Sequence, residues 1–483
     1  MSEARTTETS TPWQEQDWRR LFPWTILFRA SRIALDPRKL LLAALALVAL
    51  SFWWGLLALV FVPNRPQDPS SKEYRDWYNT WAQKVQLGTW PGYADDRGQN
   101  PYLVVSEAPG RLWTYDFWRT QGPVLMEPFR HILRPVTMFF ETSPWQRDWW
   151  FLLFGLLGSL AIWGFFAGAI TRLACIEFAK RDRIGFKEGL LFACKRYLHF
   201  LGAPVFPIVG VGVMVVVMVL GAFFILIVPW LGDVLGGLLG FLPLLGGLLM
   251  VLLLAVYLAW PLMYASISTE GGDTLDALSR SYAYLFSRPW RYLFYWMVAL
   301  VYGTLVVFVA VLAVSLIAYL SKWALDKAWF PQFRYEGNPV ANLYYFAPTS
   351  YEWDRLLMGS DLTTPEARER LWENMSPAAK LGAVLNGIWL HGLFLLMIGY
   401  AYSYFWSVST GVYLLMRQAV DETDLEEVYQ EEEEESAAES TGMTTMPLTQ
   451  PESASPPGPE AVAAESQPSQ GAGQPPSPPA TSP

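Results

Sequence analysis

The chain has 483 residues, of which 52% are hydrophobic and 16% aromatic. Only 16% are charged, against about 25% for an ordinary soluble domain. Two Cys and three His are too few for a disulfide-stapled secreted module or a Cys/His zinc protein, and a net charge of −9 excludes a basic nucleic-acid binder. We therefore expect a membrane protein with no nucleic acid among its partners.

The N-terminal region, residues 1–39, precedes a charge-free apolar stretch over residues 40–62. A cleaved signal peptide would have a shorter leader, a shorter apolar core and a small-residue cleavage site. We therefore interpret this stretch as a first transmembrane helix. Residues 24–35 place apolar side chains opposite Arg29 and Arg32, as in a basic interfacial helix that binds lipid headgroups. The positive flank of a first span explains the same residues and is compatible with this interpretation.

Five further stretches are long and apolar enough to cross a bilayer core, which needs about 20 residues. They cover residues 149–171, 200–230, 238–263, 292–320 and 381–416. Between residues 197 and 269 the only charged residue is Asp233, and one span cannot use that length, so Gly232 and Asp233 predict a short external turn over 231–237. A soluble all-helical core is the alternative, but Trp and Tyr cluster at the ends of these stretches as in aromatic belts. We expect an all-α polytopic membrane protein with six transmembrane helices.

Basic residues near the spans predict the orientation. Residues 18–39 hold six basic residues and one acidic residue, and the loop 172–199 holds seven basic and three acidic residues. The predicted external turn has no basic residue. We therefore expect both termini, the loop 172–199 and the loop 264–291 to be cytoplasmic. The external segments are then 63–148 and 321–380.

The two external segments are long enough to fold, and we expect them to pack together as one cap. Residues 127–134 form an amphipathic pattern that suits the membrane surface. In the second segment Thr364 suits a helix N-cap, Pro365 the first helical position and Glu366 the helix dipole, which predicts a helix to about Asn374. The many aromatic residues are interpreted as packing groups, with sugar- or lipid-binding platforms as the alternative.

The C-terminal region, residues 417–483, differs in composition from the rest. From Asp421 onward it holds 14 acidic residues and no Lys or Arg, together with many Pro and Ser. Such a segment buries too little apolar surface to offset its ordering entropy, so we predict a disordered tail. The run Glu431–Glu435 is interpreted as solvated and self-repelling, with a site for a basic partner or a cation as the alternative.

A faint repeat with an offset of 88 residues relates residues 188–197 to residues 276–285. Each stretch reads as an amphipathic helix that begins with an acidic residue and leads into a span. A true repeat would mean helical-hairpin units in the same orientation, whereas amphipathic helices also resemble one another by chance.

Several stretches resemble a family. The sequence of residues 274–292 is similar to a stretch found in uncharacterised bacterial multi-pass inner-membrane proteins, as are Leu21–Trp24, Ala34–Lys39 and Val412–Arg417. A more distant resemblance is to the membrane domain that accompanies some glycerophosphodiester phosphodiesterases. These resemblances imply a bacterial inner-membrane location and a topology, and they carry no catalytic residues.

No catalytic motif is present in the sequence. There is no Gly-x-Ser-x-Gly elbow, no His-Glu-x-x-His pair and no phosphate-binding Gly-x-x-x-x-Gly-Lys-Ser/Thr loop. His131, His199 and His391 are not at metal-ligand spacing, and Asp233 lacks the second membrane Asp of an intramembrane aspartyl protease. We expect no enzyme activity, no cofactor and no metal.

Small and polar residues inside the spans are the remaining candidates. Glycines at four-residue spacing let helices approach closely in lipid, although Gly is also common in apolar spans and turns. The packing candidates are Gly164 and Gly168 in the second span, and Gly232, Gly236 and Gly240 near the predicted turn. In the sixth span, Asn386 and His391 are predicted buried polar residues, and we expect His391 to be neutral and hydrogen-bonded to a neighbouring helix, with a role in transport as the alternative.

Two classes of function remain. A non-enzymatic scaffold or partner-binding subunit explains the two external segments, the glycines and the charged tail. A permease-like transporter of a small or lipid-like substrate explains the prolines Pro204, Pro207 and Pro243 in the spans, but the spans hold no deep acidic residue to carry a coupling ion. We favour the scaffold, with membrane lipids and a protein partner or a second copy of the chain as its partners.

Overall fold

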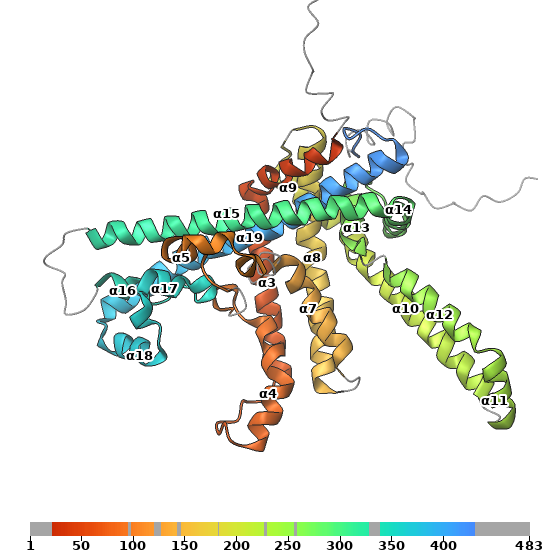
Figure 1. Ribbon diagram of the computed structural model, residues 1–483, viewed down its shortest axis with the longest axis horizontal. Helices are drawn as coiled ribbons and strands as arrows, with labels where there is room; N and C mark the ends of the chain where they lie inside the picture. Colours follow the sequence, from red (N-terminus) through yellow and green to blue (C-terminus); the bar gives the residue numbers. More distant parts are fainter. Residues whose placement is uncertain are drawn as a thin grey trace, which may run out of the picture. The chain divides into compact units, whose positions relative to one another are not determined.

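The computed structural model describes residues 22–94, 98–119, 127–142, 146–181, 183–226, 229–255, 258–327 and 339–429. Within these ranges, α-helices and short 3-10 helices are the only regular secondary structure (Figure 1). The predicted all-helical class is therefore confirmed. The disordered tail, predicted from residue 417, lies outside the described residues from residue 430 onward.

Five helices of the described chain are long and apolar enough to cross a membrane by length and composition. They are α3 (Pro37–Phe61), α8 (Arg147–Ala179), α10 (Tyr197–Leu226), α15 (Pro289–Lys327) and α19 (Pro377–Asp421). Capping explains why α3 and α19 begin before the predicted spans: the side chains of Asp36 and Ser376 accept hydrogen bonds from Arg38 N and Ala379 N, and each is followed by a Pro.

The stretch predicted as the fourth span is divided. It forms α12 (Phe241–Ala255) and the first residues of α13 (Trp260–Glu270), which begins at a Trp-Pro pair because Pro261 suits a helix start and disfavours helix before it. The external turn expected over 231–237 is wrong: these residues lie in the helix α11 (Pro229–Leu238), which starts with a Pro. The chain turns instead at residues 239–240, after α11.

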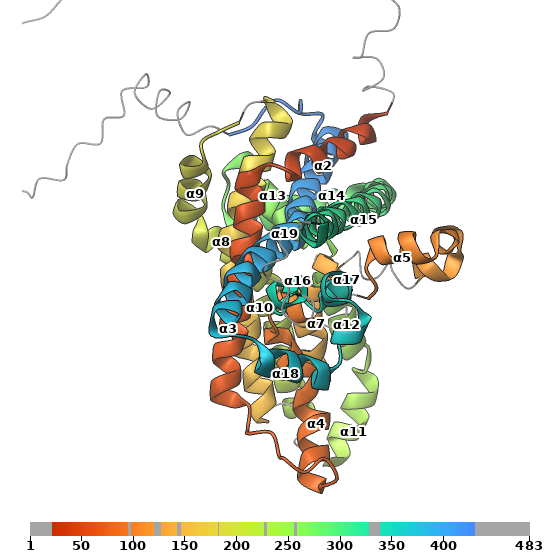
Figure 2. The same ribbon diagram turned by 90° about the vertical axis from the view of Figure 1, so that its left-hand side faces the viewer.

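The core of the bundle is built from α8 and α19, each of which contacts α3, α13 and the other. Aromatic rings fill these contacts: Trp163 of α8 stacks on Tyr402 of α19 with ring centroids 5.2 Å apart, and the ring centroid of Tyr264 in α13 lies 5.0 Å from that of Trp406 in α19. Helix α15 packs along α19, where the Tyr404 hydroxyl donates to Ala299 O over 2.8 Å. Figure 2 shows these helices from the side.

The N-terminal segment predicted as an interfacial helix is a 3-10 helix, η1 (Pro23–Phe28), followed by α2 (Arg29–Ala34). Both pack on α19, and α2 also contacts α8. Leu27 and Ala30 are fully buried there. Apolar residues of this segment therefore pack into the bundle core, in addition to the membrane-surface role that was predicted for them.

The two segments predicted to be external consist of short helices. The first contains α4 (Lys72–Val85), η3 (Pro91–Tyr93), α5 (Pro101–Glu107) and α7 (Glu127–Glu141), and the second contains α16 (Pro339–Leu343), α17 (Trp353–Met358) and α18 (Pro365–Asn374). They contact each other: Ser350 Oγ lies 2.9 Å from Pro91 O and 2.7 Å from Ala94 O, and its one hydroxyl proton is shared between these two carbonyls. The predicted N-cap of α18 is confirmed, because the Thr364 hydroxyl accepts from the backbone N–H of Ala367.

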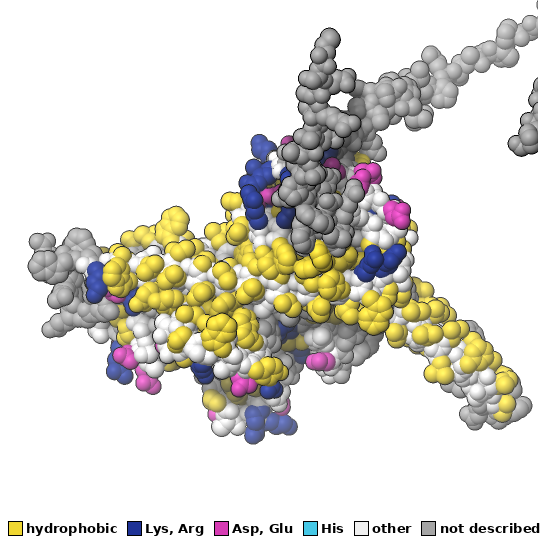
Figure 3. Space-filling view, turned by 45° about the horizontal axis from the view of Figure 1, so that its top comes forward, with side chains coloured by type: hydrophobic (Ala, Val, Ile, Leu, Met, Phe, Trp, Pro, Cys, Tyr) yellow, Lys and Arg dark blue, Asp and Glu magenta, His cyan; other side chains and the backbone are white. Residues whose placement is uncertain are grey.

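The hairpin of α10, α11 and α12 has little apolar surface buried within the chain. In its most apolar stretch, only 6% of the α10 residues are buried, against 28–44% in the other four long helices. Helix α12 packs on α10, and Met218 lies over Gly246 at that contact. Figure 3 shows hydrophobic side chains over this hairpin and along α15.

Candidate functional site

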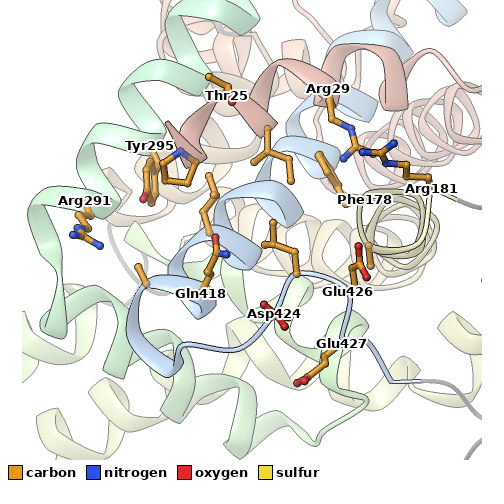
Figure 4. Close-up of a pocket in the computed structure, with 16 residues that line it drawn as sticks. Thr25, Arg29, Phe178, Arg181, Arg291, Tyr295, Gln418, Asp424, Glu426 and Glu427 are labelled. Atoms are coloured by element: carbon orange, nitrogen blue, oxygen red, sulfur yellow. The ribbon is translucent and has the colours of Figure 1, made fainter. Parts of the chain in front are cut away.

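A cavity of about 1050 Å³ lies at one end of the bundle. We call this end the charged end; it comprises η1, α2, the start of α3, the C-terminal ends of α8, α13 and α19, and residues 422–429. The cavity opens between η1, the end of α8, the start of α15 and the end of α19 (Figure 4).

Three arginines from three different elements line this cavity. Arg29 donates from Nη2 to Glu177 O over 3.4 Å, and its guanidinium lies 5.9 Å from the Phe178 ring centroid. Figure 4 shows the Arg29 and Arg181 side chains reaching toward each other, with Arg291 farther along the cavity. Arg181 and Arg291 line the cavity with exposed side chains, so their guanidinium groups are accessible to a ligand.

The acidic wall of the cavity comes from a segment that the sequence pattern assigned to the disordered tail. Asp424, Glu426 and Glu427 line it. Arg417 fixes this segment by donating from Nη1 to Glu427 O over 2.5 Å, and its Nη2 lies 3.9 Å from the Glu427 carboxylate. The predicted boundary at residue 417 is therefore wrong, because α19 continues to Asp421 and the next residues make specific contacts.

Backbone hydrogen bonds anchor the end of this segment. Tyr429 N donates to Thr269 O over 2.9 Å, and Arg172 Nη2 donates to Tyr429 O over 2.9 Å. Gly271 ends α13 with φ +65°, and the Tyr429 ring occupies the space where a Cβ of residue 271 would lie. Only Gly meets both conditions without strain, so the end of α13 is shaped to receive the chain's C-terminal segment.

Apolar residues complete the cavity. Ile26, Phe178, Leu415 and Leu425 line it between the basic and acidic groups. The Tyr295 hydroxyl and the Gln418 amide add uncharged polar groups. The site therefore combines anion-binding, cation-binding and apolar surfaces, which is the chemistry needed to hold an amphiphilic molecule.

A network of buried charges supports the charged end behind the cavity. Lys39 is fully buried, and its Nζ lies 2.5 Å from Glu177 Oε2 and 3.0 Å from Ile33 O. Arg417 Nε lies 2.9 Å from Glu270 Oε1. Sequence reasoning missed these pairs, because it interpreted basic residues next to the spans only as signals of orientation.

Helix α14 (Thr274–Ser287) adds a further contact to this network. Its Tyr284 hydroxyl donates to the Asp421 carboxylate at the end of α19. Burial and the nearby Asp421 carboxylate raise the pKa of Tyr284 above its ordinary value. The phenol therefore remains a hydrogen-bond donor at neutral pH and links α14 to the residues that precede the acidic wall.

Of the two arginines predicted to bind lipid headgroups, Arg29 and Arg32, one lines the cavity and the other does not. Arg29 lines the cavity, whereas Arg32 is exposed and lies outside its lining. Arg181 and Arg291, which complete the basic lining, were not predicted, and their only signal in the sequence is a position next to a long apolar helix.

The predicted buried polar residues of α19 bind the two segments that were predicted to be external. Asn386 Nδ2 donates to Leu343 O over 2.8 Å. Trp90 Nε1 donates to His391 Nδ1 over 3.1 Å, and His391 Nε2 lies 3.3 Å from the Tyr93 hydroxyl. Because an indole N–H can only donate, a neutral His391 carries its proton on Nε2. The expected partner of His391 was a neighbouring helix, and the structure places it against the 3-10 helix η3 and the residue before it.

The predicted glycines differ in how closely they are packed. A Cβ on Gly168 would lie 2.7 Å from the Phe200 ring, so this glycine is required for contact between α8 and α10. A Cβ on Gly164 would meet its nearest neighbour at 3.6 Å, an ordinary contact. Gly232 and Gly236 belong to α11, and Gly240 comes after it; a Cβ on Gly240 would meet only Gly236 O and Gly237 O of its own segment within 4 Å.

Two smaller cavities lie between α3 and α7, one of them bordered by residues 86–94 and the other by α8. One has a volume of about 280 Å³ and polar lining groups that include Gln86, Tyr93 and Arg134, while the other, of about 80 Å³, reaches Trp163 and Trp260. Leu50, Leu87 and His131 line both cavities. Within the described residues, no three His, Cys, Asp or Glu side chains come together as a possible metal site.

Comparison of the chain with known proteins finds no match among protein-family models, curated proteins or solved structures.

Proposed function

We propose that the chain is a non-enzymatic integral membrane protein of the bacterial inner membrane that acts as a scaffold or a partner-binding subunit. In this proposal it crosses the membrane six times, with the charged end and both termini in the cytoplasm. The sixth crossing falls to α12, whose 15 residues span about 22 Å, so the bilayer thins locally around it.

We also propose that the segments 63–148 and 321–380 form one external cap. The hydrogen bonds from Ser350 to the first segment support this arrangement. Further support comes from Ser315 of α15, whose Oγ lies 3.1 Å from both Asn100 Nδ2 and Trp353 Nε1. One residue of a long helix thus bonds to both segments.

The observation that carries the scaffold proposal is the hairpin of α10–α12. Its α10 stretch buries only 6% of its residues within the chain. Gly212, Gly221 and Gly247 have no atom within 4 Å of the space that a Cβ would occupy, so contacts within the chain do not require a glycine at these positions. In lipid, exposed small residues allow another helix to approach closely, and we propose that the hairpin binds a membrane helix of a partner.

Native purification followed by identification of co-purified proteins tests this function. Gly212→Leu, Gly221→Leu and Gly247→Leu each fill open space, so we expect folding to be unchanged and at least one variant to lose the partner. Val309→Leu on the exposed surface of α15 is the matched control and should keep it. Absence of any stable partner, or a partner retained by all three glycine variants, would refute the proposal.

Reporter fusions test the orientation separately. A reporter placed after Ser436 should be cytoplasmic and one placed after Asn100 external. The opposite result at either position would overturn the proposed topology. It would not affect the partner proposal, which the purification experiment tests separately.

The permease is the second candidate, and the two cavities beside α3 and α7 favour it. One has Tyr93 and Arg134 in its lining, the other has Trp163 and Trp260, and the two share the lining residues Leu50, Leu87 and His131. A transported substrate should raise the thermal unfolding temperature of the purified protein. Leu50→Trp, which narrows both cavities, should abolish that increase, whereas a scaffold would show no substrate-dependent stabilisation.

A further inference from the structure

We propose that the cavity at the charged end binds the headgroup of a phospholipid that carries both a phosphate and a primary ammonium, the chemistry of phosphatidylethanolamine. This inference rests on the proposed function in one respect, the placement of the charged end at the membrane surface. It assigns a lipid class to a site where the sequence predicted only headgroup contact by Arg29 and Arg32.

The size of the cavity suits such a ligand. Pockets for small ligands have volumes of about 300–1,000 Å³, and this cavity has about 1050 Å³. It therefore has room for a headgroup, the glycerol backbone and the first part of the acyl chains. The apolar lining by Ile26, Phe178, Leu415 and Leu425 matches the glycerol and acyl portion.

The arginines specify the phosphate. Guanidinium groups bind phosphate oxygens through paired, charge-assisted hydrogen bonds, and Arg29, Arg181 and Arg291 line the same cavity. Figure 4 shows Arg29 and Arg181 directed toward one place from two different elements. Two like charges that approach each other are stabilised by an anion between them.

The acidic wall specifies the ammonium. Asp424, Glu426 and Glu427 place carboxylates in the lining that also holds the three arginines, and of these carboxylates Glu427 lies 3.9 Å from Arg417 Nη2. A purely anionic headgroup would leave carboxylates opposed to its negative charge, whereas a zwitterionic headgroup places an ammonium against them. A primary ammonium also donates hydrogen bonds to carboxylates, which the quaternary ammonium of a choline headgroup cannot do.

Aromatic residues beside the cavity favour a lipid over a free phosphodiester. Trp24 in η1 packs against Phe294 of α15 with ring centroids 6.1 Å apart, and Phe28 is 39% exposed. Trp and other aromatic side chains mark the headgroup level of a bilayer. The cavity therefore lies beside a surface suited to the acyl chains of a bound lipid.

The test is native mass spectrometry of the full chain, purified in detergent and equilibrated with equal amounts of phosphatidylethanolamine, phosphatidylglycerol and phosphatidylcholine. We expect one phosphatidylethanolamine to be retained in preference to the other two. Arg181→Gln and Arg291→Gln should each weaken its binding about tenfold, the usual effect of removing one hydrogen-bonding charge. Both side chains are exposed, so the unfolding curve of each variant should match the wild type.

A matched control and a soluble competitor complete the test. Arg32→Gln changes an exposed arginine of α2 outside the cavity and should leave lipid binding unchanged. Equal retention of phosphatidylglycerol, or the same loss in Arg32→Gln as in Arg181→Gln, would overturn the proposal. Binding of glycerophosphoethanolamine as tightly as the lipid would overturn the assignment to a membrane lipid. Because these readouts use protein in micelles, a failure of the partner or topology proposals leaves them unaffected.

Discussion

The buried ion pair at the start of α3 gives the most direct test of how the charged end is stabilised. The Lys39 side chain is fully buried and that of Glu177 is 11% exposed, with 2.5 Å between Nζ and Oε2. The ammonium also has Ile33 O at 3.0 Å and the Asp36 carboxylate at 3.9 Å, while Glu177 has Arg183 Nε at 3.5 Å. Each partner therefore keeps a different second charge nearby when the other is removed: Asp36 for Lys39 and Arg183 for Glu177.

Removing one partner of a buried pair leaves an uncompensated charge, which costs about 3–5 kcal/mol. For Glu177→Leu we expect a loss of about 3 kcal/mol in the free energy of unfolding, the lower end of that range, because Asp36 remains near Lys39. Lys39→Met should cost less, about 2 kcal/mol, because Glu177 keeps Arg183 and some solvent. The double variant replaces the pair by apolar groups and should lose no more than about 2–3 kcal/mol, which gives a coupling energy of about 2–3 kcal/mol.

The measurement is a double-mutant cycle on reversible unfolding of the purified protein in mixed micelles. The matched control is the exposed pair Arg280 and Asp276 on α14, whose side chains are 36% and 41% exposed. Alanine variants of that pair should couple by only about 0.3–0.5 kcal/mol. The reasoning would be refuted if the coupling of Lys39 and Glu177 were no larger than that of the exposed pair.

Three further predictions use the same purified protein. Gly168→Ala should lower the free energy of unfolding by about 1–3 kcal/mol, because the new methyl group meets a buried ring. Gly164→Ala is the control and should leave the free energy of unfolding nearly unchanged. Equal effects of the two substitutions would contradict the packing of α8. His391→Leu should lower the free energy of unfolding by about 0.6 kcal/mol, the average for a membrane hydrogen bond. A larger loss in unfolding measurements would contradict a role limited to one such hydrogen bond. Cys194 is exposed and should react with a maleimide in the folded protein, while the buried Cys175 should react only after unfolding.

The sequence predicted the long helices because their signal is local. A charge-free stretch of the right length is visible without knowing what packs against it, as for α3 and α15. Prediction failed between residues 229 and 260 for a related reason. That region holds a single charged residue, Asp233, so hydropathy gives little boundary within it, and the break before α13 depends on the Trp260-Pro261 helix start.

The candidate cavity was beyond prediction because its parts are distant in the sequence. Arg29 was found from the amphipathic pattern of its own segment, but Arg181 and Arg291 each looked like the flank of a span. The acidic wall was not predicted, because Asp424 and Glu427 belong to a stretch whose acidic, Pro-rich composition is typical of a disordered tail. Its order comes from Arg417 and other groups of the bundle, which no local pattern reveals.

The 88-residue offset has a counterpart in the structure. Helix α9 (Phe186–Lys195) has its N-cap at Gly185 and α14 has its N-cap at Asp273, 88 residues later; the third residues, Glu188 and Asp276, are both acidic. The fully buried Ala193 and Ser281 keep the same offset. The two helices therefore share an acidic third residue and a buried position at the same offset, although Asp273 caps α14 with its side chain and Gly185 has no side chain to do so.

This equivalence bears on the exposed hairpin. Helix α9 packs on α8 and precedes α10, just as α14 packs on α13 and precedes α15. The two units differ along their long helix. Helix α15 packs along α19, a helix of 45 residues, whereas α10 contacts α8, α12 and α13. The most apolar stretch of α10 is nevertheless only 6% buried within the described chain, where that of α15 is 28% buried. We therefore propose that the hairpin partner is a membrane helix that covers this exposed surface of α10, and cross-links from α10 should reach such a helix.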